Sequence, residues 1–328
     1  MFDMDIGMIG LSYKSACFKT RENFTLVFDA IRRDYTGVLV NTCNRSEFYF
    51  SYENVEQALK SIFSCISRHI ENIEHSPLYH ALGLNCFQHL GRVTSGIDSI
   101  IFGESDIQRQ VKISYQKALK GKKLPKELHF LFQKGLKIGK NTRQLFFKSN
   151  KKLILPSIIY SILEKTLENT QNVKALLIGN SSINRKIVPF FQQRGLEITL
   201  MTTRVDKEKN KYRFKMTNQD ILNNWHDFDV IIAATNRKVS LPFLEGKNFK
   251  QKIIIDLGMP SNFDRKVFND KFIKFLDVDE VLQNVHSTID PKVSTLSSYF
   301  VQKSVEKQFL IFQHKPLCQM ESPDMVLV

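Results

Sequence analysis

VKALLIG, residues Val173–Gly179, is a short continuous apolar run that ends in glycine. An amphipathic segment, Ser181–Gly195, and a second apolar run, Leu196–Thr202, follow it directly. This succession predicts a strand, a helix and a second strand. Similar apolar runs occur later in the chain, at Asp229–Ala234, Lys252–Leu257 and Phe272–Leu276. Strands that alternate with helices predict a parallel sheet with crossover helices, which is the Rossmann-like architecture of nucleotide-binding domains.

Residues before this region predict a separate α/β domain. Ile6–Leu11 and Val38–Phe50 have the pattern of strands, and Asn23–Arg32 between them has that of a helix. From Asn85 to Lys120, apolar residues recur at helical spacing on both sides of a polar turn that contains glycines. The sequence therefore predicts two domains and a helical tail, with boundaries at residues 1–152, 153–278 and 279–328. The tail carries an apolar face that it cannot bury alone, so we expect it to dock on the body or on a second copy.

The composition is that of a soluble globular protein. The chain has 328 residues, of which 42% are hydrophobic and 24% are charged. No apolar run approaches the roughly 18 to 20 residues of a membrane span, and the first residues lack the basic flank of a signal peptide. We therefore expect a cytoplasmic protein with no membrane contact. The five cysteines include no C-x-x-C pair, which predicts neither a disulfide framework nor a metal site.

Positive charge is concentrated in one stretch of the chain. The net charge is +14, and residues 111–153 contain thirteen basic residues against the single acid Glu127. The thirteen are Lys112, Lys117, Lys120, Lys122, Lys123, Lys126, Lys134, Lys137, Lys140, Arg143, Lys148, Lys151 and Lys152. A solvated helical face is one interpretation. Because so large a block of one sign repels itself, we favour binding to a structured RNA backbone.

Cys43 and His89 are the candidates for chemistry. Cys43 stands at the end of an apolar run and is followed by Asn44 and Arg45. A nearby cation stabilises a thiolate, so Cys43 is a candidate nucleophile, although a buried core cysteine is the alternative. Arg45, two residues on, is predicted to share a strand face with Cys43 and could hold a carboxylate in bidentate fashion. His89 precedes the polar turn, where a functional or a purely structural histidine would both fit.

The loop after the first strand, GNSSIN, is a candidate cofactor loop. A dinucleotide fingerprint has glycine at its first, third and sixth places, and only the first is present here. Small serines at a helix N-terminus could still approach a phosphate. The second strand runs into Thr203 and Arg204, which suit a 2′-phosphate and therefore NADPH. The loop consists of Gly179, Asn180, Ser181, Ser182, Ile183 and Asn184.

Several motifs together resemble glutamyl-tRNA reductase. They are GLSYKSA (Gly10–Ala16), TCNRSE (Thr42–Glu47), HLGRVTSGIDSIIFGESDIQRQVK (His89–Lys112) and IIIDLGMPSNFD (Ile253–Asp264), in this order around the predicted βαβ unit. The resemblance implies an enzyme that uses NADPH to reduce glutamyl-tRNA(Glu) to glutamate-1-semialdehyde, the first step of tetrapyrrole synthesis by the five-carbon route. It also implies a catalytic domain, an NADPH domain and a helical dimerisation region, here shortened, and hence a homodimer that could pass its product to an aminotransferase.

The resemblance assigns roles to individual residues. Cys43 matches the nucleophile that forms a glutamyl thioester, and His89 matches a histidine important for activity. The positions that match substrate-contacting residues are Thr42, Asn44, Arg45, Ser99, Glu104, Ser105, Asp106 and Gln110.

Two other functions stay open at this point. Since GNSSIN lacks two of the three glycines, the chain could be a tRNA-binding relative that hydrolyses the ester or performs no catalysis. A dehydrogenase of a small metabolite, suggested by the parallel-sheet half alone, is the second alternative.

Overall fold

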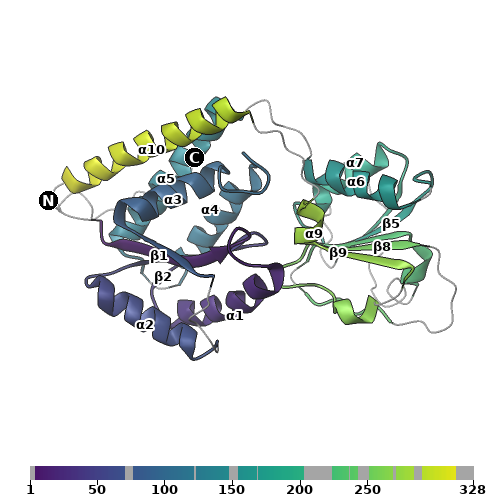
Figure 1. The fold of residues 1–328 in the computed structure, drawn as a ribbon, viewed down its shortest axis with the longest axis horizontal. Coiled ribbons are helices and arrows are strands. Elements are labelled where there is room, and N and C mark those ends of the chain that lie inside the picture. Colours follow the sequence, from purple (N-terminus) through teal and green to yellow (C-terminus); the bar gives the residue numbers. More distant parts are fainter. Residues whose placement is uncertain are drawn as a thin grey trace. The chain divides into compact units, whose positions relative to one another are not determined.

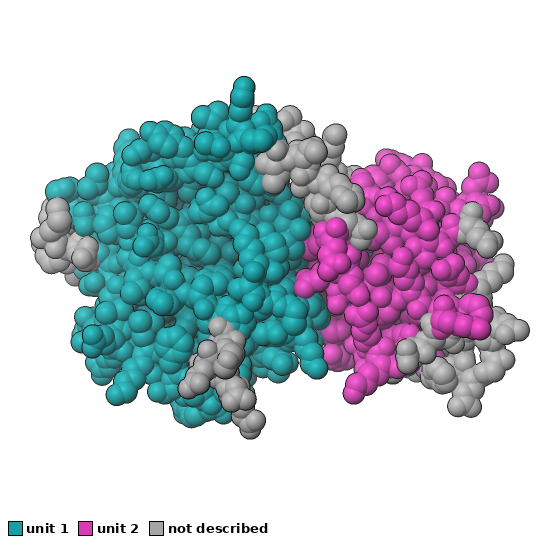
Figure 2. Space-filling model, viewed as in Figure 1, with its two compact units in different colours: residues 1–151, 287–328 teal, residues 152–286 magenta. Residues whose placement is uncertain are grey.

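The computed structural model describes residues 4–70, 77–121, 123–147, 154–167, 169–202, 224–235, 237–242, 251–268, 271–283 and 290–314. The chain forms two compact units (Figures 1 and 2). Unit 1 comprises Met1–Lys151 and Ser287–Val328, and unit 2 comprises Lys152–His286. Within the described residues, every helix is too short or too polar to cross a bilayer.

Unit 1 is built on a four-stranded antiparallel sheet with the order β2-β3-β1-β4. The strands are β1 (Ile6–Ser12), β2 (Gly37–Thr42), β3 (Arg45–Ser51) and β4 (Tyr79–Leu82). The predicted strand over Val38–Phe50 is wrong in one respect, because the chain reverses at Cys43 and Asn44 and makes a hairpin of β2 and β3. Consequently Cys43 and Arg45 do not share one strand face, as we had expected from their spacing.

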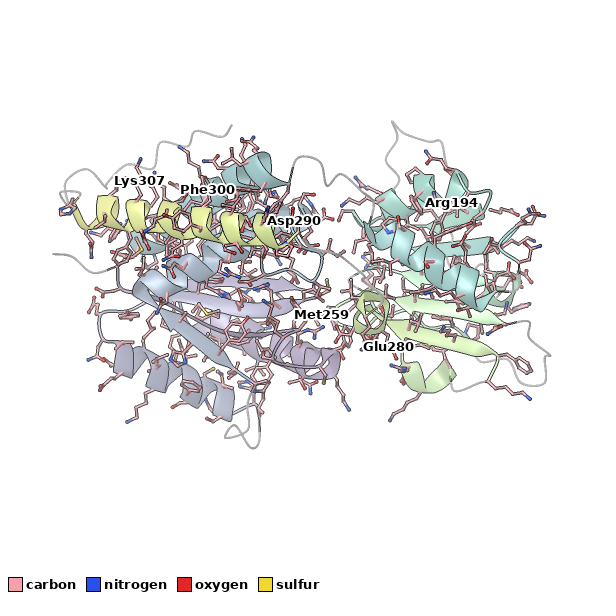
Figure 3. All side chains as sticks on the ribbon, turned by 45° about the horizontal axis from the view of Figure 1, so that its top comes forward. Arg194, Met259, Glu280, Asp290, Phe300 and Lys307 are labelled. Carbon is pink, nitrogen blue, oxygen red and sulfur yellow. The ribbon has the colours of Figure 1, made fainter. Side chains whose placement is uncertain are left out.

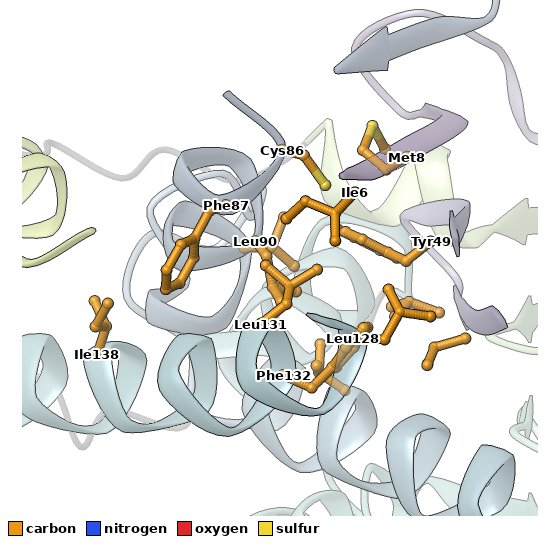
Figure 4. Packing of buried hydrophobic residues seen from close by; sticks show 14 of the residues in the cluster. Ile6, Met8, Tyr49, Cys86, Phe87, Leu90, Leu128, Leu131, Phe132 and Ile138 are labelled. Atoms are coloured by element: carbon orange, nitrogen blue, oxygen red, sulfur yellow. The ribbon is translucent and has the colours of Figure 1, made fainter. Parts of the chain in front are cut away.

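Helices cover both faces of this sheet because alternate residues of each strand point to opposite sides. Met8 and Tyr49 face a core that includes Phe87, Leu131 and Phe132 (Figure 4). That side is covered by α3 (Gly83–Ser95), α4 (Asp106–Leu119) and α5 (Lys126–Phe146). Residues of the other parity, such as Ile9 and Phe48, face a second core under α1 (Phe18–Asp34) and α2 (Val55–Ser67). The predicted helix, polar turn and helix over Asn85–Lys120 are confirmed as α3, the turn and α4.

The long C-terminal helix α10 (Pro291–His314) belongs to unit 1 and packs on α3 and α5. Gly91 allows the close approach, since a Cβ atom there would lie 3.0 Å from Val301 and 3.2 Å from Val305. Phe300, labelled in Figure 3, stacks edge-on against Phe146 of α5. Much of the apolar face predicted for the tail, including Val301, Val305 and Phe312, is therefore buried on unit 1 of the same chain, whereas Leu310 is exposed. A dimerisation role for residues 279–328 stays a prediction.

Unit 2 contains a five-stranded parallel sheet with the order β6-β5-β7-β8-β9. Its strands are β5 (Lys174–Ile178), β6 (Glu197–Met201), β7 (Val230–Ala233), β8 (Lys252–Asp256) and β9 (Ile273–Asp277). Its helices include α6 (Ile154–Thr166), α7 (Asn184–Gln192) and the short α9 (Val278–Leu282). The predicted α/β class with a parallel sheet is confirmed. Because β6 and β7 lie on opposite sides of β5, the strand order reverses at the end of β5, where ligands of such sheets bind.

Candidate active site

Cys43 and Asn44 are the two central residues of the β2–β3 hairpin, and several contacts fix this turn. The Thr42 hydroxyl oxygen accepts hydrogen bonds from the backbone N–H groups of Asn44 and Arg45, each at 3.2 Å. The fully buried Arg21 of α1 donates from Nη2 to the Cys43 carbonyl oxygen at 3.0 Å. The half-buried Cys43 is therefore held at the tip of a braced turn, beside a buried cation.

A fully buried carboxylate, that of Glu47 on β3, organises the residues around the hairpin. Its Oε1 accepts hydrogen bonds from Arg45 Nη1 at 2.8 Å, from the Tyr79 hydroxyl at 2.7 Å and from His89 Nε2 at 2.9 Å. Its Oε2 accepts one from the Tyr49 hydroxyl at 2.8 Å. The predicted residues Arg45 and His89 are thus brought together, by an acid that connects two strands and α3.

The charges of this cluster are fixed by one another. Burial by itself raises the pKa of the Glu47 carboxyl, but the positive charge of Arg45 and the contact with His89 hold that pKa well below its usual range. Glu47 is therefore ionised and can only accept hydrogen bonds, so His89 Nε2 carries the proton of this contact. Burial, with the added charge of Glu47, raises the pKa of Tyr79, which stays a neutral donor.

Arg45 is only 2% exposed, and its guanidinium joins two parts of the site. While Nη1 binds Glu47, Nη2 donates to the backbone carbonyl of Asp98 at 2.6 Å. Its Nε is buried and has no partner among the described residues, and the same holds for Oδ1 of Asn44. Each of these two atoms retains hydrogen-bonding capacity that nothing described in the fold satisfies.

Asp98 lies in the turn after α3 and collects two further cations. Its carboxylate binds Lys14 Nζ at 2.9 Å and Arg92 Nε at 2.9 Å. Burial raises the pKa of this carboxyl, but the hydrogen bonds and charges of Arg92 and Lys14 outweigh that effect and lower it. Asp98 is therefore ionised, and it connects the turn to the loop that follows β1.

The remaining predicted substrate residues lie on this turn and at the start of α4. Ser99 is buried, and its backbone N–H donates to the carbonyl of Gly96 at 3.3 Å. Glu104 packs its backbone against Gly96, whose φ is +81°. Ser105 is the N-cap of α4 but caps no backbone group with its side chain, and Asp106 and Gln110 follow on the helix.

Tyr13 connects the turn to the hairpin: its N–H donates to the Asn44 carbonyl at 2.9 Å. Burial raises the pKa of Tyr13 and outweighs the opposing positive charges of Lys14 and Arg45.

Sequence reasoning missed the residues that hold the candidate site in place. They are Lys14, Arg21, Glu47, Tyr79, Arg92 and Asp98, whose ionised carboxylate binds Lys14 and Arg92. One local signal could have identified part of the set: Arg45, Glu47 and Tyr49 alternate along β3, so polar and charged groups repeat on one face of a strand whose other face carries Phe48 and Phe50.

The GNSSIN loop in unit 2 joins β5 to α7 at the point where the strand order reverses. Gly179 has a φ of +97°, and a Cβ atom there would lie 2.6 Å from the carbonyl oxygen of Ala234 after β7. This glycine therefore makes the tight turn that the first place of a dinucleotide fingerprint needs. Ser181 Oγ accepts from the N–H of Asn184 at 3.1 Å and so caps the start of α7.

Asn184 occupies the sixth place, where the fingerprint has glycine. Its side chain is fully buried, and Nδ2 donates to the carbonyls of Ile178 at 3.1 Å and Gly179 at 2.7 Å. Its Oδ1 is buried with no partner among the described residues. The tight turn and the helix N-terminus fit a pyrophosphate, and the asparagine braces the loop in place of close glycine packing. Thr203 and Arg204, the predicted 2′-phosphate residues, lie outside the described residues.

The loops after β7 and β8 complete the same edge of the sheet. Asn262 donates from Nδ2 to the carbonyls of Thr235 and Arg237, each at 2.8 Å. Asp256 at the end of β8 accepts from the backbone N–H groups of Gly258 and Asn262, at 2.9 and 2.7 Å. Among the described residues, no group of histidine, cysteine, aspartate and glutamate side chains is arranged to hold a metal ion.

Comparison with known proteins identifies relatives over most of the chain. Residues 9–145 match the family model of the glutamyl-tRNA(Glu) reductase N-terminal domain. Glutamyl-tRNA reductase of Chlamydia pneumoniae is 30% identical over 302 residues, which is 87% of this chain and 86% of the relative. That of Chlamydia caviae is 31% identical over 333 residues, 95% and 94% of the two chains. The solved structure of the Methanopyrus kandleri reductase is 19% identical with a TM-score of 0.47, covering 94% of this chain and 80% of that one.

Proposed function

This chain belongs to the glutamyl-tRNA reductase family, and from that membership we propose that it reduces the glutamyl group of glutamyl-tRNA to glutamate-1-semialdehyde through a thioester on Cys43. The observation that carries the proposal is the braced hairpin: it holds the half-buried Cys43 at its tip, with Arg21 on the Cys43 carbonyl oxygen and Arg45 on the buried Glu47 carboxylate. A reacting sulfur needs such a fixed position because acyl transfer depends on the alignment of the attacking atom.

In the first step, the Cys43 sulfur attacks the ester carbonyl that joins glutamate to the 3′ end of the tRNA. A sulfur–carbon bond forms, the carbon–oxygen ester bond breaks, and the ribose oxygen leaves with a proton. The product is a glutamyl thioester on Cys43 and deacylated tRNA. A thioester accepts hydride more readily than a carboxylate, which is the chemical purpose of the covalent stage.

Two unsatisfied groups next to Cys43 suit the amino acid part of the substrate. Asn44 Oδ1 would accept from the α-ammonium group of the glutamyl residue, and Arg45 Nε would donate to its side-chain carboxylate. Both atoms are buried, so side chains of the hairpin must move to admit the substrate. Nη1 and Nη2 of Arg45 each use one of their two N–H groups on Glu47 and Asp98, so Nε–H and one N–H on each η nitrogen remain as donors. Selectivity for glutamate would then depend on the turn geometry as well as on charge.

His89 would move the proton of the first step. Its Nε2 is engaged with Glu47, so Nδ1 is the ring nitrogen that can take a proton from the thiol and return it to the leaving oxygen. Nδ1 has no hydrogen-bond partner among the described residues.

The cofactor would bind at the edge of the unit 2 sheet. Gly179, the backbone at Ser181 and Ser182 and the N-terminus of α7 would hold the pyrophosphate. The cofactor supplies the hydride that converts the thioester to the aldehyde and restores the thiolate. We propose NADPH over NADH because Thr203 and Arg204 replace the acidic residue typical of NAD-specific sites. A homodimer, and transfer of the aldehyde to an aminotransferase, are further parts of the proposal.

The experiment is a reaction with glutamyl-tRNA carrying radiolabelled glutamate, with no cofactor, with NADPH and with NADH. We expect protein-bound glutamate without cofactor, and semialdehyde with NADPH in preference to NADH. Cys43→Ser should abolish both products. Cys17→Ser is the matched control, because Cys17 is an exposed thiol on the same unit and should be dispensable.

Three results would contradict the proposal in different ways. Label that persists in Cys43→Ser would exclude this nucleophile. Release of glutamate and tRNA with no semialdehyde, even with NADPH, would support the ester-hydrolysing alternative. Reduction of a small metabolite with no response to glutamyl-tRNA would support the dehydrogenase alternative.

A further inference from the structure

We propose that the outward face of α4, the turn that follows it and the first residue of α5 bind the phosphate backbone of the tRNA, while the hairpin receives the acylated end. The surface consists of five lysines, which we call the α4 lysine surface: Lys112, Lys117, Lys120, Lys123 and Lys126. This inference rests on the proposed function and adds where the RNA is held.

All five side chains are exposed, and none of them forms an ion pair with another described residue. Two other cations of unit 1 do have acidic partners: Lys303 pairs with Glu306 at 2.8 Å on α10, and Arg32 pairs with Asp29 at 3.1 Å on α1. Uncompensated cations of one sign destabilise the folded state unless a polyanion neutralises them. The α4 lysine surface therefore carries charge that the fold itself does not use.

The structure divides the basic block predicted from sequence into two parts. On α5, Arg143 is half-buried and donates to the carbonyl of Thr94, and Lys134 lies over the Phe130 ring at 5.5 Å from its centroid. These two residues serve the packing of α5 against its neighbours. Lys137 and Lys140 of α5 are exposed as well, and like the α4 lysine surface they form no ion pair among the described residues. The α4 lysine surface is the larger of these two exposed groups and is the one that we assign to the partner.

The spacing of the surface fits a nucleic-acid backbone. Lys112 and Lys120 are two helical turns apart, about 12 Å along the axis, a length over which each strand of a nucleic acid presents several phosphates. The exposed positions between them, such as Ile113, Gln116 and Lys117, include no aromatic ring on which a base could stack. A grip on the backbone, indifferent to base sequence, is the mode that these residue types support.

The position of α4 connects this surface to the chemistry. The helix packs directly on β2, whose last residue, Thr42, precedes the nucleophile. It also begins immediately after the turn that carries Asp98, the partner of Arg45. RNA held on the outward face of α4 is thus bound to an element that contacts both sides of the candidate active site.

The test compares two double charge reversals that change the net charge equally. Lys112→Glu/Lys120→Glu alters the α4 lysine surface. Lys60→Glu/Lys307→Glu is the matched control, with exposed lysines on α2 and α10 (Lys307 is labelled in Figure 3). The affinity for glutamyl-tRNA is measured between about 50 and 200 mM salt, because each lost phosphate contact lowers the salt slope by roughly one.

We expect the α4 variant to bind at least about tenfold more weakly and to lose about two from its salt slope, whereas the control stays within about twofold of the parent. The Michaelis constant for glutamyl-tRNA should rise while the turnover at saturation stays near that of the parent. Transfer of glutamate to Cys43 from a small glutamyl thioester, which has no RNA, should be the same in all three proteins.

The outcomes separate this inference from the proposed function. If the parent protein binds no tRNA and acquires no label on Cys43, the proposed function itself fails. If the parent binds and reacts but the two double variants lose affinity equally, the α4 lysine surface is wrong. Capture of phosphatidylserine vesicles by the surface, with RNA affinity unchanged, would overturn it in favour of a membrane. Should the glutamate variant fail to fold, Lys112→Gln/Lys120→Gln against Lys60→Gln/Lys307→Gln gives the same comparison without added negative charge.

Discussion

The hairpin at Cys43 in unit 1 and the loop at Gly179 in unit 2 are both turns that follow a β-strand, but they are held in different ways. Buried ions hold the hairpin: the guanidinium of Arg45 and the carboxylate of Glu47 are almost inaccessible to water and depend on each other. Neutral groups hold the Gly179 loop, where the amide of Asn184 donates to two backbone carbonyls.

This difference predicts different tolerance to change. Removing one member of a buried ion pair leaves a charge with no partner, and that costs far more than the loss of a neutral hydrogen bond. A sequence can therefore replace a fingerprint glycine with Asn184 and keep the loop intact. No comparable replacement is available at Glu47, because four donors converge on its two oxygens.

The largest effect should come from Glu47→Gln. It leaves Arg45 charged and buried, so we expect unit 1 to lose about 3–5 kcal/mol of unfolding free energy. Urea unfolding can follow the units separately, because the single tryptophan of the chain, Trp225, is buried in unit 2. The far-ultraviolet transition should split, with one component shifted to lower urea and the Trp225 fluorescence transition unchanged.

Two further variants control this result. Glu53→Gln removes an exposed carboxylate close by in the chain and should change stability by less than about 0.5 kcal/mol. Arg45→Met/Glu47→Gln removes both charges and should recover part of the loss, since no buried ion is then uncompensated. A Glu47→Gln protein as stable as the parent would show that the ion pair does not hold the hairpin.

Acid should also distinguish the two units, because their buried carboxyls are shifted in opposite directions. In unit 1, the pKa values of Glu47 and Asp98 are below their ordinary range, owing to their cationic partners and despite burial. Their stabilisation is present above the unfolded values near pH 4 and is lost as the pH falls below them. In unit 2, burial raises the pKa of Asp256 and Asp277, so their ionisation is less favourable in the folded state than in the unfolded state. Protonation of these two carboxyls at lower pH therefore stabilises unit 2.

The measurement is the urea midpoint of each unit as a function of pH. Between about pH 7 and 5 the Trp225 midpoint should rise or hold, and below about pH 4 the unit 1 midpoint should fall. Parallel decline of both midpoints across the whole range would contradict the assignment of opposite shifts.

The sequence predicted a region well where its structure depends on residues close together in the chain, and poorly where it depends on contacts between distant residues. The parallel sheet was predictable because each of its strands is a short apolar run with turn signals on both sides. The hairpin was not, since neither Cys43 nor Asn44 is followed by the glycine that marks most two-residue turns. Its geometry depends on Tyr13, 31 residues away from Asn44 in the chain, and on the Thr42 hydroxyl.

The Glu47 cluster illustrates the same limit at the candidate site. Its members Tyr79 and His89 lie 32 and 42 residues from Glu47, and no local spacing pairs residues at such separations. Family resemblance located Cys43, Arg45 and His89, whose roles stay predictions, but it did not indicate that one carboxylate joins two of them. Likewise, the helical pattern of the tail showed that a face must be buried, and only the structure shows that α3 and α5 bury it.

The smallest expected effect tests the loop of unit 2 and isolates its contact with the neighbouring strand. Gly179→Ala puts a Cβ atom on a residue with φ of +97°, 2.6 Å from the Ala234 carbonyl oxygen. Gly195→Ala is the matched control: φ there is +82°, and its Cβ would meet nothing within 4 Å. Both substitutions put a side chain on a left-handed backbone, which costs about 1–2 kcal/mol of the unfolding free energy of unit 2. Any further loss of stability in Gly179→Ala therefore measures the contact with the Ala234 carbonyl, just after β7. Because the turn would hold the pyrophosphate, only Gly179→Ala should weaken NADPH binding. The dissociation constant should rise about tenfold for each 1.4 kcal/mol of binding free energy that is lost. Labelling of Cys43 by glutamyl-tRNA should be unchanged in both.

Equal NADPH affinity in the two variants would mean that cofactor binding does not depend on the Gly179 turn. The comparison of this loop with the Cys43 hairpin would then concern stability alone.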